Sequence, residues 1–142
     1  DTAPLIYYLE EHPADLPLLD PFFAAVTDGS VPVITSTVRL LEVLVAPRSD
    51  GDERLVRRYR QMLLDTRGID VHPVSDVVAE TAARPRADYN VRTPDAIQLA
   101  TASSVAPSHF LTNDRRLQSL PSIEVLLVDD HFSLSEEQRR NQ

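Results

Sequence analysis

The sequence predicts an α/β fold in which helices cover both faces of a parallel sheet. Short runs of β-branched and aliphatic residues alternate along the chain with longer segments that carry apolar residues at helical spacing. Strands separated by helices in this way pair in parallel, because each helix returns the chain to the same end of the sheet. The 142 residues fit a single domain over residues 1–142, with enough buried surface for a core.

Two helices are predicted before the first strand. Thr2-Ala3-Pro4 begins a short helix with proline in its first turn, and residues 12–17 close it. A second helix covers residues 17–28 and ends at Gly29. The residues of this second helix that we expect to face inward are Leu18, Phe22, Phe23 and Val26.

A strand and a third helix follow. The β-branched run at residues 31–34 predicts the strand. Ser36 or Thr37 then caps a helix, because a hydroxyl there can accept a hydrogen bond from an otherwise unpaired backbone N–H. We expect this helix to run through Val45 and to stop at Pro47.

The middle of the chain predicts a helix, a strand and another helix. Residues 52–67 place apolar side chains at helical spacing between many charges, which is typical of an amphipathic surface helix. Residues 69–71 predict a strand, and Ser75 caps the next helix. Pro85 should end or kink that helix, with a break near Arg84.

The last third begins with the sharpest helix start in the chain. In Thr93-Pro94-Asp95, threonine caps the helix and proline takes its first position, and the helix extends to about Val105. A strand over residues 110–112 leads into a short helix opened by residues 113–114. Residues 123–128 predict the last strand, and the polar residues 129–142 form a docking helix or a loose tail.

Composition excludes several kinds of chemistry. All 14 basic residues are arginines, so mechanisms that require a lysine, including those of receiver domains, haloacid-dehalogenase-like phosphatases and P-loop enzymes, are not available. There is no cysteine and no apolar stretch of membrane-spanning length, so we expect a soluble, cytoplasmic protein without thiolate chemistry. The net charge of -8 argues against a broad basic surface for nucleic acid, so any such contact should be local.

Four acids, Asp1, Glu42, Asp95 and Asp114, each stand where an apolar run meets a helix start or lie inside a helix. The fold would bring them together at the carboxyl edge of the sheet. Clustered carboxylates repel one another, and a divalent cation is the commonest partner that makes such a cluster favourable. The sequence therefore predicts a metal-dependent enzyme.

Each acid also has a simpler explanation. Glu42 interrupts an apolar helical run, where it could instead pair with Arg39 three residues earlier or lie on a narrow polar stripe. Asp95 and Asp114 could serve only as helix caps, and Asp1 alone says almost nothing. The four histidines show no ligand spacing, so zinc is not expected. Oxygen ligands favour Mg²⁺, with Mn²⁺ as the other candidate.

Three segments together resemble the successive motifs of PIN domains, most closely those of VapC-type toxins from toxin-antitoxin pairs. The segments are Ile34-Thr35-Ser36-Thr37 through Glu42-Val43-Leu44, Arg92-Thr93-Pro94-Asp95-Ala96 through Leu99-Ala100-Thr101-Ala102, and Phe110-Leu111-Thr112-Asn113-Asp114-Arg115-Arg116-Leu117. The resemblance covers essentially the whole chain in the right order. It implies a three-layer α/β/α sandwich with a mostly parallel central sheet.

The resemblance also implies an activity. By position, Asp1, Glu42, Asp95 and Asp114 become catalytic metal or metal-water ligands for one or two Mg²⁺ ions that hydrolyse RNA. Thr112 is similar to the family's hydroxyl residue near the site, and Ser36 stands where a small polar residue supports the first acid. The neighbouring arginines are candidates for phosphate contact or, more simply, exposed helix charges. These arginines are Arg92, Arg115 and Arg116.

The implied partners are an RNA substrate (tRNA, rRNA or mRNA), a cognate antitoxin and a second copy in a homodimer. The amphipathic helices over residues 5–28 and 52–64 offer apolar surface for the antitoxin or the second copy. The alternative is a PIN-like module that binds RNA or protein without cleaving it. In the family the first acid ends a central strand, so we expect a strand before Asp1 that this sequence does not include.

Overall fold

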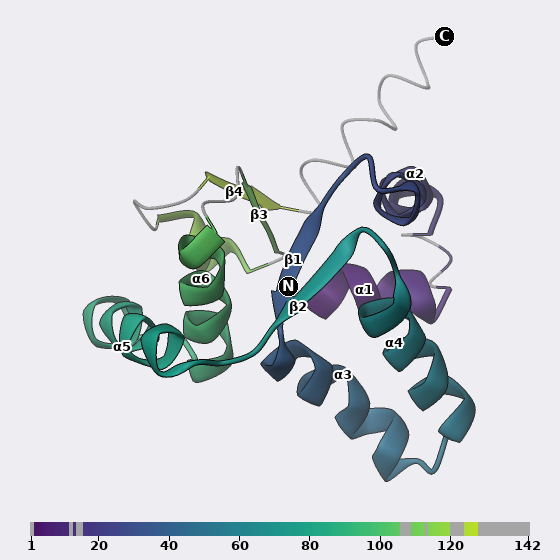
Figure 1. Cartoon of the computed structure of the whole chain (residues 1–142), viewed down its shortest axis with the longest axis horizontal. Helices are drawn as coiled ribbons and strands as arrows, with labels where there is room; N and C mark the ends of the chain where they lie inside the picture. The colour runs from purple at the N-terminus through teal and green to yellow at the C-terminus, as the bar shows by residue number, and fades with distance from the viewer. Residues whose placement is uncertain are drawn as a thin grey trace, which may run out of the picture.

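The computed structural model describes residues 2–11, 13, 16–105, 109–112, 114–119 and 124–127. Helices and strands alternate through this part of the chain (Figure 1), as expected. In chain order the elements are α1 (Thr2–Leu9), α2 (Leu16–Asp28), β1 (Val33–Ser36), α3 (Thr37–Ser49), α4 (Glu53–Asp65), β2 (Ile69–His72), α5 (Asp76–Tyr89), α6 (Thr93–Val105), β3 (His109–Thr112), the 3₁₀ helix η1 (Arg115–Ser119) and β4 (Glu124–Leu127).

The strands pair in parallel, which confirms the α/β prediction. β1 pairs with β2, and β3 pairs with β4. We expected one sheet, but the described strands form two separate pairs. The carboxyl end of β1 at Ser36 leads directly into α3, and that of β3 at Thr112 lies just before η1. These two strand ends position most of the candidate site.

Three apolar clusters hold the helices in place. The largest joins α1, α2, α3 and α4, with Leu19, Tyr59 and Leu63 among its buried side chains. A second joins α6 to β3 and η1 through Leu99, Phe110 and Leu117, and a third packs α5 on α6. Figure 1 shows α3 and α4 packed together on one side of β1 and β2, and α5 and α6 packed together on the other.

Gly68 fixes the approach of β2 to α2. A Cβ atom at this position would lie 1.8 Å from the carbonyl oxygen of Val26, so no other residue fits without a backbone shift. The Gly68 carbonyl in turn accepts a hydrogen bond of 2.8 Å from the N–H of Val33, at the start of β1. β1 begins at Val33, two residues later than predicted. The N–H of Val31 instead donates a hydrogen bond to the carbonyl of Ala25 in α2.

Pro47 and Pro85 lie inside helices, so the predictions that a helix stops at Pro47 and breaks near Arg84 were wrong. Pro47 is buried in the last part of α3, where its missing N–H costs one hydrogen bond near the end of the helix. Pro85 lies within α5, which continues to Tyr89 and has no break at Arg84. The close packing of α5 on α6 offsets the cost of a proline in a helix interior, about 3 kcal/mol.

The predicted cap of α5 is confirmed, whereas Ser36 at the cap position of α3 makes no side-chain cap hydrogen bond. Ser75 caps α5, because its hydroxyl accepts a hydrogen bond from the N–H of Val78. Asp52 caps α4, because its carboxylate accepts a hydrogen bond from the N–H of Leu55. None of the described helices is long and apolar enough to cross a bilayer. The predictions for Asp1, the Leu18 side chain, Asn113 and residues 129–142 lie outside the described residues.

Candidate metal site and nucleic-acid contacts

A buried polar network joins the end of β1 to α6. The Gln98 side chain on α6 donates a hydrogen bond of 2.8 Å from Nε2 to the hydroxyl of Ser36, which is fully buried. Its Oε1 accepts a longer hydrogen bond of 3.4 Å from Thr35. Ser36 stands at the cap position of α3, but its side chain makes no cap hydrogen bond. The hydroxyl predicted to cap α3 therefore instead ties β1 to the helix that carries Asp95.

Glu42 lies on α3 and is half-buried, and it forms an ion pair with Arg39 one helical turn earlier. Arg39 is 4% exposed. Burial lowers the pKa of the Arg39 guanidinium, although the neighbouring carboxylates of Glu42 and Asp95 act against this. The structure thus shows the ion pair that was the simpler explanation for Glu42.

Asp95 lies in the first turn of α6, as the Thr93-Pro94-Asp95 start predicts, and its side chain is 5% exposed. Arg92 holds both carboxylate oxygens, with its Nε 2.9 Å from Oδ2 and its Nη2 3.4 Å from Oδ1. The hydrogen bond to Asp95, followed by its negative charge, raises the pKa of Arg92. A nearly buried aspartate at this position is therefore fixed by both its helix and its ion pair.

Asp114 follows β3 and is also held by an arginine of its own segment. The Nε of Arg116 lies 2.8 Å from Oδ1 and 3.1 Å from Oδ2 of Asp114. This hydrogen bonding lowers the pKa of the Asp114 carboxyl below its usual range. Thr112, which is fully buried, accepts a hydrogen bond of 3.0 Å from the N–H of Asp114. Arg115, the third candidate for phosphate contact, is exposed at the start of η1.

The three described acids share one electrostatic environment. Arg39 interacts with both Glu42 and Asp95. Arg92 interacts with Asp114 as well as Asp95, and Arg116 interacts with Asp95 as well as Asp114. Arginines that interact with more than one acid therefore link Glu42 to Asp95 and Asp95 to Asp114, and each of the three carboxylates forms an ion pair with an arginine. Asp1, the fourth predicted acid, lies outside the described residues.

The carboxylates of Glu42, Asp95 and Asp114 are chemically suited to a hard cation, because oxygen ligands are those that Mg²⁺ and Mn²⁺ prefer. Among the residues that the structure describes, no three acidic or histidine side chains lie close enough together to hold an ion as they stand. Each described acid of the region is instead engaged by an arginine.

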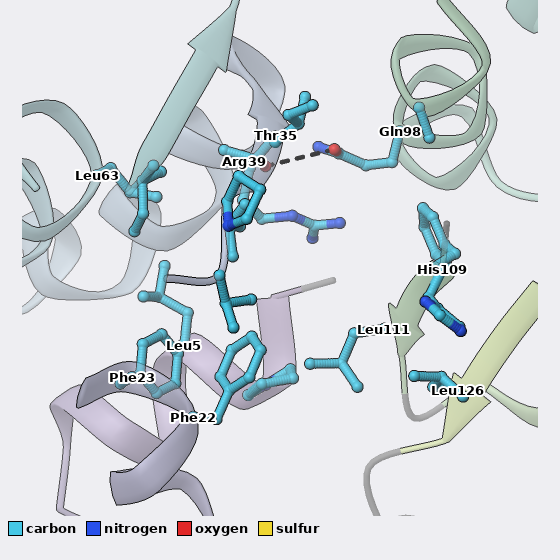
Figure 2. A pocket seen from close by; sticks show the side chains of 18 of the residues that line it. Leu5, Phe22, Phe23, Thr35, Arg39, Leu63, Gln98, His109, Leu111 and Leu126 are labelled. Carbon is cyan, nitrogen blue, oxygen red and sulfur yellow. Dashed lines mark hydrogen bonds between the residues drawn. The ribbon is translucent and has the colours of Figure 1, made fainter. Parts of the chain in front are cut away.

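A cavity of about 650 Å³ lies between the two strand pairs. In Figure 2, Thr35 and Arg39 border it on one side and His109, Leu111 and Leu126 on another, with Leu5, Phe22 and Phe23 at its base. Gln98 also points into this space. The lining is mainly apolar, and it includes residues of β1, β3 and β4.

Sequence reasoning missed Gln98 as part of the site. The sequence does contain a pattern that points to Gln98. This residue lies three positions after Asp95 and is the one amide in the run of mostly small and apolar residues from Ala96 to Ala102. A polar side chain on the buried face of a helix requires a partner. In this chain the partner is Ser36, which the sequence analysis had placed near the site for a different reason.

The PIN domain profile matches residues 1–123. The chain belongs to the PIN domain family. Among curated proteins, none matches the sequence. The fold resembles that of a solved structure described as a toxin-antitoxin complex from Klebsiella pneumoniae, with 21% identity, a TM-score of 0.64, and coverage of 90% of this chain and 94% of that one.

A second solved structure shows the same PIN fold. It is the crystal structure of VapBC2 from Rickettsia felis bound to a DNA fragment from their promoter, with 12% identity and a TM-score of 0.62. The match covers 89% of this chain and 95% of that one. Identities this low show a shared fold, which confirms the predicted PIN-like α/β architecture.

Proposed function

We propose that this PIN domain is a Mg²⁺-dependent endoribonuclease and the toxin of a toxin-antitoxin pair. The observation that supports the proposal is that Glu42, Asp95 and Asp114, each on a different segment, are linked by arginines that interact with more than one of them. Family membership supports it, since PIN domains are generally nucleases. In this proposal Asp1 is the fourth acid.

The four acids would hold Mg²⁺, and Mn²⁺ would also fit their oxygen donors. Such an ion supplies a bound water of lowered pKa and stabilises charge on the phosphate. The Gln98–Ser36 hydrogen bond keeps α6, which carries Asp95, in place against β1. Arg92, Arg115 and Arg116 would contact RNA phosphates, because their exposed guanidinium groups are suited to bind anions locally on an acidic protein.

We propose further that a strand preceding Asp1 occupies the cavity between the two strand pairs. Among the described strands β1 pairs only with β2 and β3 pairs only with β4, so each pair leaves an edge available. The cavity between them is lined mainly by apolar side chains. A strand there would join the pairs into one parallel sheet, bury its apolar residues, and end with Asp1 near the other acids.

The proposed protein partners are an antitoxin and a second copy of the chain. The solved structures with a similar fold are, by their titles, toxin-antitoxin or VapBC complexes. The leucine, isoleucine, phenylalanine and valine side chains described in α1 and α2 are buried or half-buried, so these helices do not offer the apolar surface that we expected. On α3, however, Leu41 and Val45 are 66% and 58% exposed and one helical turn apart.

This exposed pair on α3 supports a protein contact, which sedimentation equilibrium can test. For the homodimer, wild-type protein should sediment as a dimer and Leu41→Asp as a monomer. A wild-type monomer at all concentrations would refute the homodimer proposal.

The proposed activity is tested by incubating purified protein with a mixed tRNA, rRNA and mRNA pool. Cleavage should require Mg²⁺, stop with EDTA and be absent in Asp95→Asn. The matched control is Asp88→Asn, which removes an acid that pairs with Arg84 on the exposed side of α5. RNA binding without cleavage by wild-type protein would instead identify an inactive PIN-like binding module.

A further inference from the structure

Two of the arginine–carboxylate pairs join a nearly buried acid to an exposed arginine. The Asp95 and Asp114 side chains are 5% and 17% exposed, whereas those of Arg92 and Arg116 are 66% and 73% exposed. The acids are held by their positions in α6 and after β3. Ion pairs with exposed long side chains contribute little net free energy, because water, salt and side-chain entropy compete with them. The arginines are therefore the partners that can leave.

The third pair has the opposite arrangement. Arg39 is the buried member, with a side chain that is 5% exposed, and Glu42 is the more exposed one at 30%. Moving Arg39 away from Glu42 would take an opposite charge away from a guanidinium group in the protein interior, which is costly. Arg39 is thus a fixed part of the site, in contrast to Arg92 and Arg116.

The two exposed arginines occupy the lone pairs that a metal ion would need. Arg92 contacts both carboxylate oxygens of Asp95, and Arg116 contacts both oxygens of Asp114. A divalent cation bound beside an unmoved guanidinium would also meet its positive charge. Metal binding by these aspartates therefore competes with their arginines.

We propose that Arg92 and Arg116 are exchangeable counter-ions, which hold Asp95 and Asp114 in the metal-free protein and turn to RNA phosphates when a divalent cation takes their place. This inference rests on the proposed function. Each arginine also interacts with the other pair's aspartate, and the two guanidinium groups repel each other. A divalent cation held by these aspartates would supply positive charge in place of the two guanidinium groups and so relieve that repulsion.

Isothermal titration with Mn²⁺ alone tests the exchange without any measurement of activity. Arg92→Ala and Arg116→Ala should each bind Mn²⁺ about 1.4 to 5 times more tightly than wild type, because the competing ion pair is gone. Arg84→Ala is the matched control, since it removes an exposed arginine that pairs with Asp88 on α5, and it should bind like wild type. Unchanged or weaker binding by both site variants would overturn the proposal.

The second half of the proposal concerns RNA. Binding of a 2′-O-methyl oligonucleotide, which resists cleavage, should be measured with Mn²⁺ at several salt concentrations. Each alanine variant should bind more weakly and lower the slope of log affinity against log salt by about one, the effect of one lost phosphate contact. Unchanged RNA affinity and slope would overturn the assignment of the released arginines to phosphate.

The design separates this proposal from the proposed function. If wild-type protein binds no Mn²⁺, or if Asp95→Asn binds it as well as wild type does, the metal site itself is wrong. If wild-type protein binds Mn²⁺ and Asp95→Asn does not, the metal site stands. The Mn²⁺ affinities of Arg92→Ala and Arg116→Ala then decide whether the metal displaces the arginines. Arg92→Gln and Arg116→Gln, which keep a polar side chain without the charge, should reproduce the tighter binding if a variant with alanine is poorly folded.

Discussion

Asp95→Asn should destabilise the metal-free protein, although removing one acid from a cluster relieves repulsion. The structure decides between these effects. Both neighbouring acids are already paired, Glu42 with Arg39 and Asp114 with Arg116, so little repulsion is left to relieve. Asp95 itself loses its ion pair with Arg92 and its favourable charge in the first turn of α6.

The expected loss follows from these two interactions. Because Arg92 is 66% exposed, its ion pair contributes only about 0.2–1 kcal/mol. The negative charge near the helix N-terminus contributes about 0.3–1 kcal/mol. Together they predict a decrease of about 0.5–2 kcal/mol in the free energy of unfolding. At roughly 4 °C per kcal/mol for a chain of this size, the Tm in EDTA should fall by about 2–8 °C.

Thermal unfolding in EDTA and in Mg²⁺ measures both consequences of the substitution. With Mg²⁺ at about 100 times its Kd, wild-type protein should gain about 2.7 kcal/mol, and Asp95→Asn should gain none. Asp88→Asn should match wild type within about 0.5 kcal/mol in both buffers, since Asp88 is exposed and its contact with Arg84 is 3.8 Å long. If Asp95→Asn is as stable as wild type in EDTA, or gains as much from Mg²⁺, the reasoning is refuted.

Three further outcomes are expected. Gln98→Ala should lower the free energy of unfolding by about 1–3 kcal/mol, because it leaves the buried Ser36 hydroxyl without its donor, and an unchanged Tm would contradict this. The hydrogen bond from Arg116 lowers the pKa of Asp114 below its usual 3.8. The stability that this ion pair contributes is therefore present above about pH 4 and is lost as the pH falls through the pKa of Asp114 in the folded protein. Urea unfolding should therefore show Arg116→Ala less stable than wild type at pH 6 and the difference shrinking toward pH 3, whereas a difference that is constant with pH would argue against the pair. Finally, extending the N-terminus with the proposed strand should raise the Tm and reduce binding of a hydrophobic dye, and no change in either would contradict the proposed strand.

The order of elements could be predicted from the sequence because its signals are local. The Thr93-Pro94-Asp95 start gave the beginning of α6 directly, since capping and proline preferences act within one turn. Pro47 and Pro85 misled the prediction for the same reason. Whether a proline ends a helix depends on the packing of the whole helix against its neighbours, which a local pattern does not contain.

The candidate site was predictable in part. The spacing of Arg39 and Glu42 already suggested an ion pair, and the structure has it. The pairs of Arg92 with Asp95 and of Arg116 with Asp114 were not predicted, although each joins residues two or three positions apart. The contact between Gln98 and Ser36 spans 62 positions and depends on tertiary packing, so no local pattern reveals it.

The central claim is that clustered carboxylates use a divalent cation to cleave RNA. The most direct test measures RNA cleavage and Mn²⁺ binding on the same preparation as the Mn²⁺ concentration rises. The account predicts that cleavage is half-maximal at the Kd for Mn²⁺ and that both signals vanish in Asp95→Asn. Cleavage that persists in EDTA, or Mn²⁺ binding at Asp95 with no cleavage of any RNA, would contradict it.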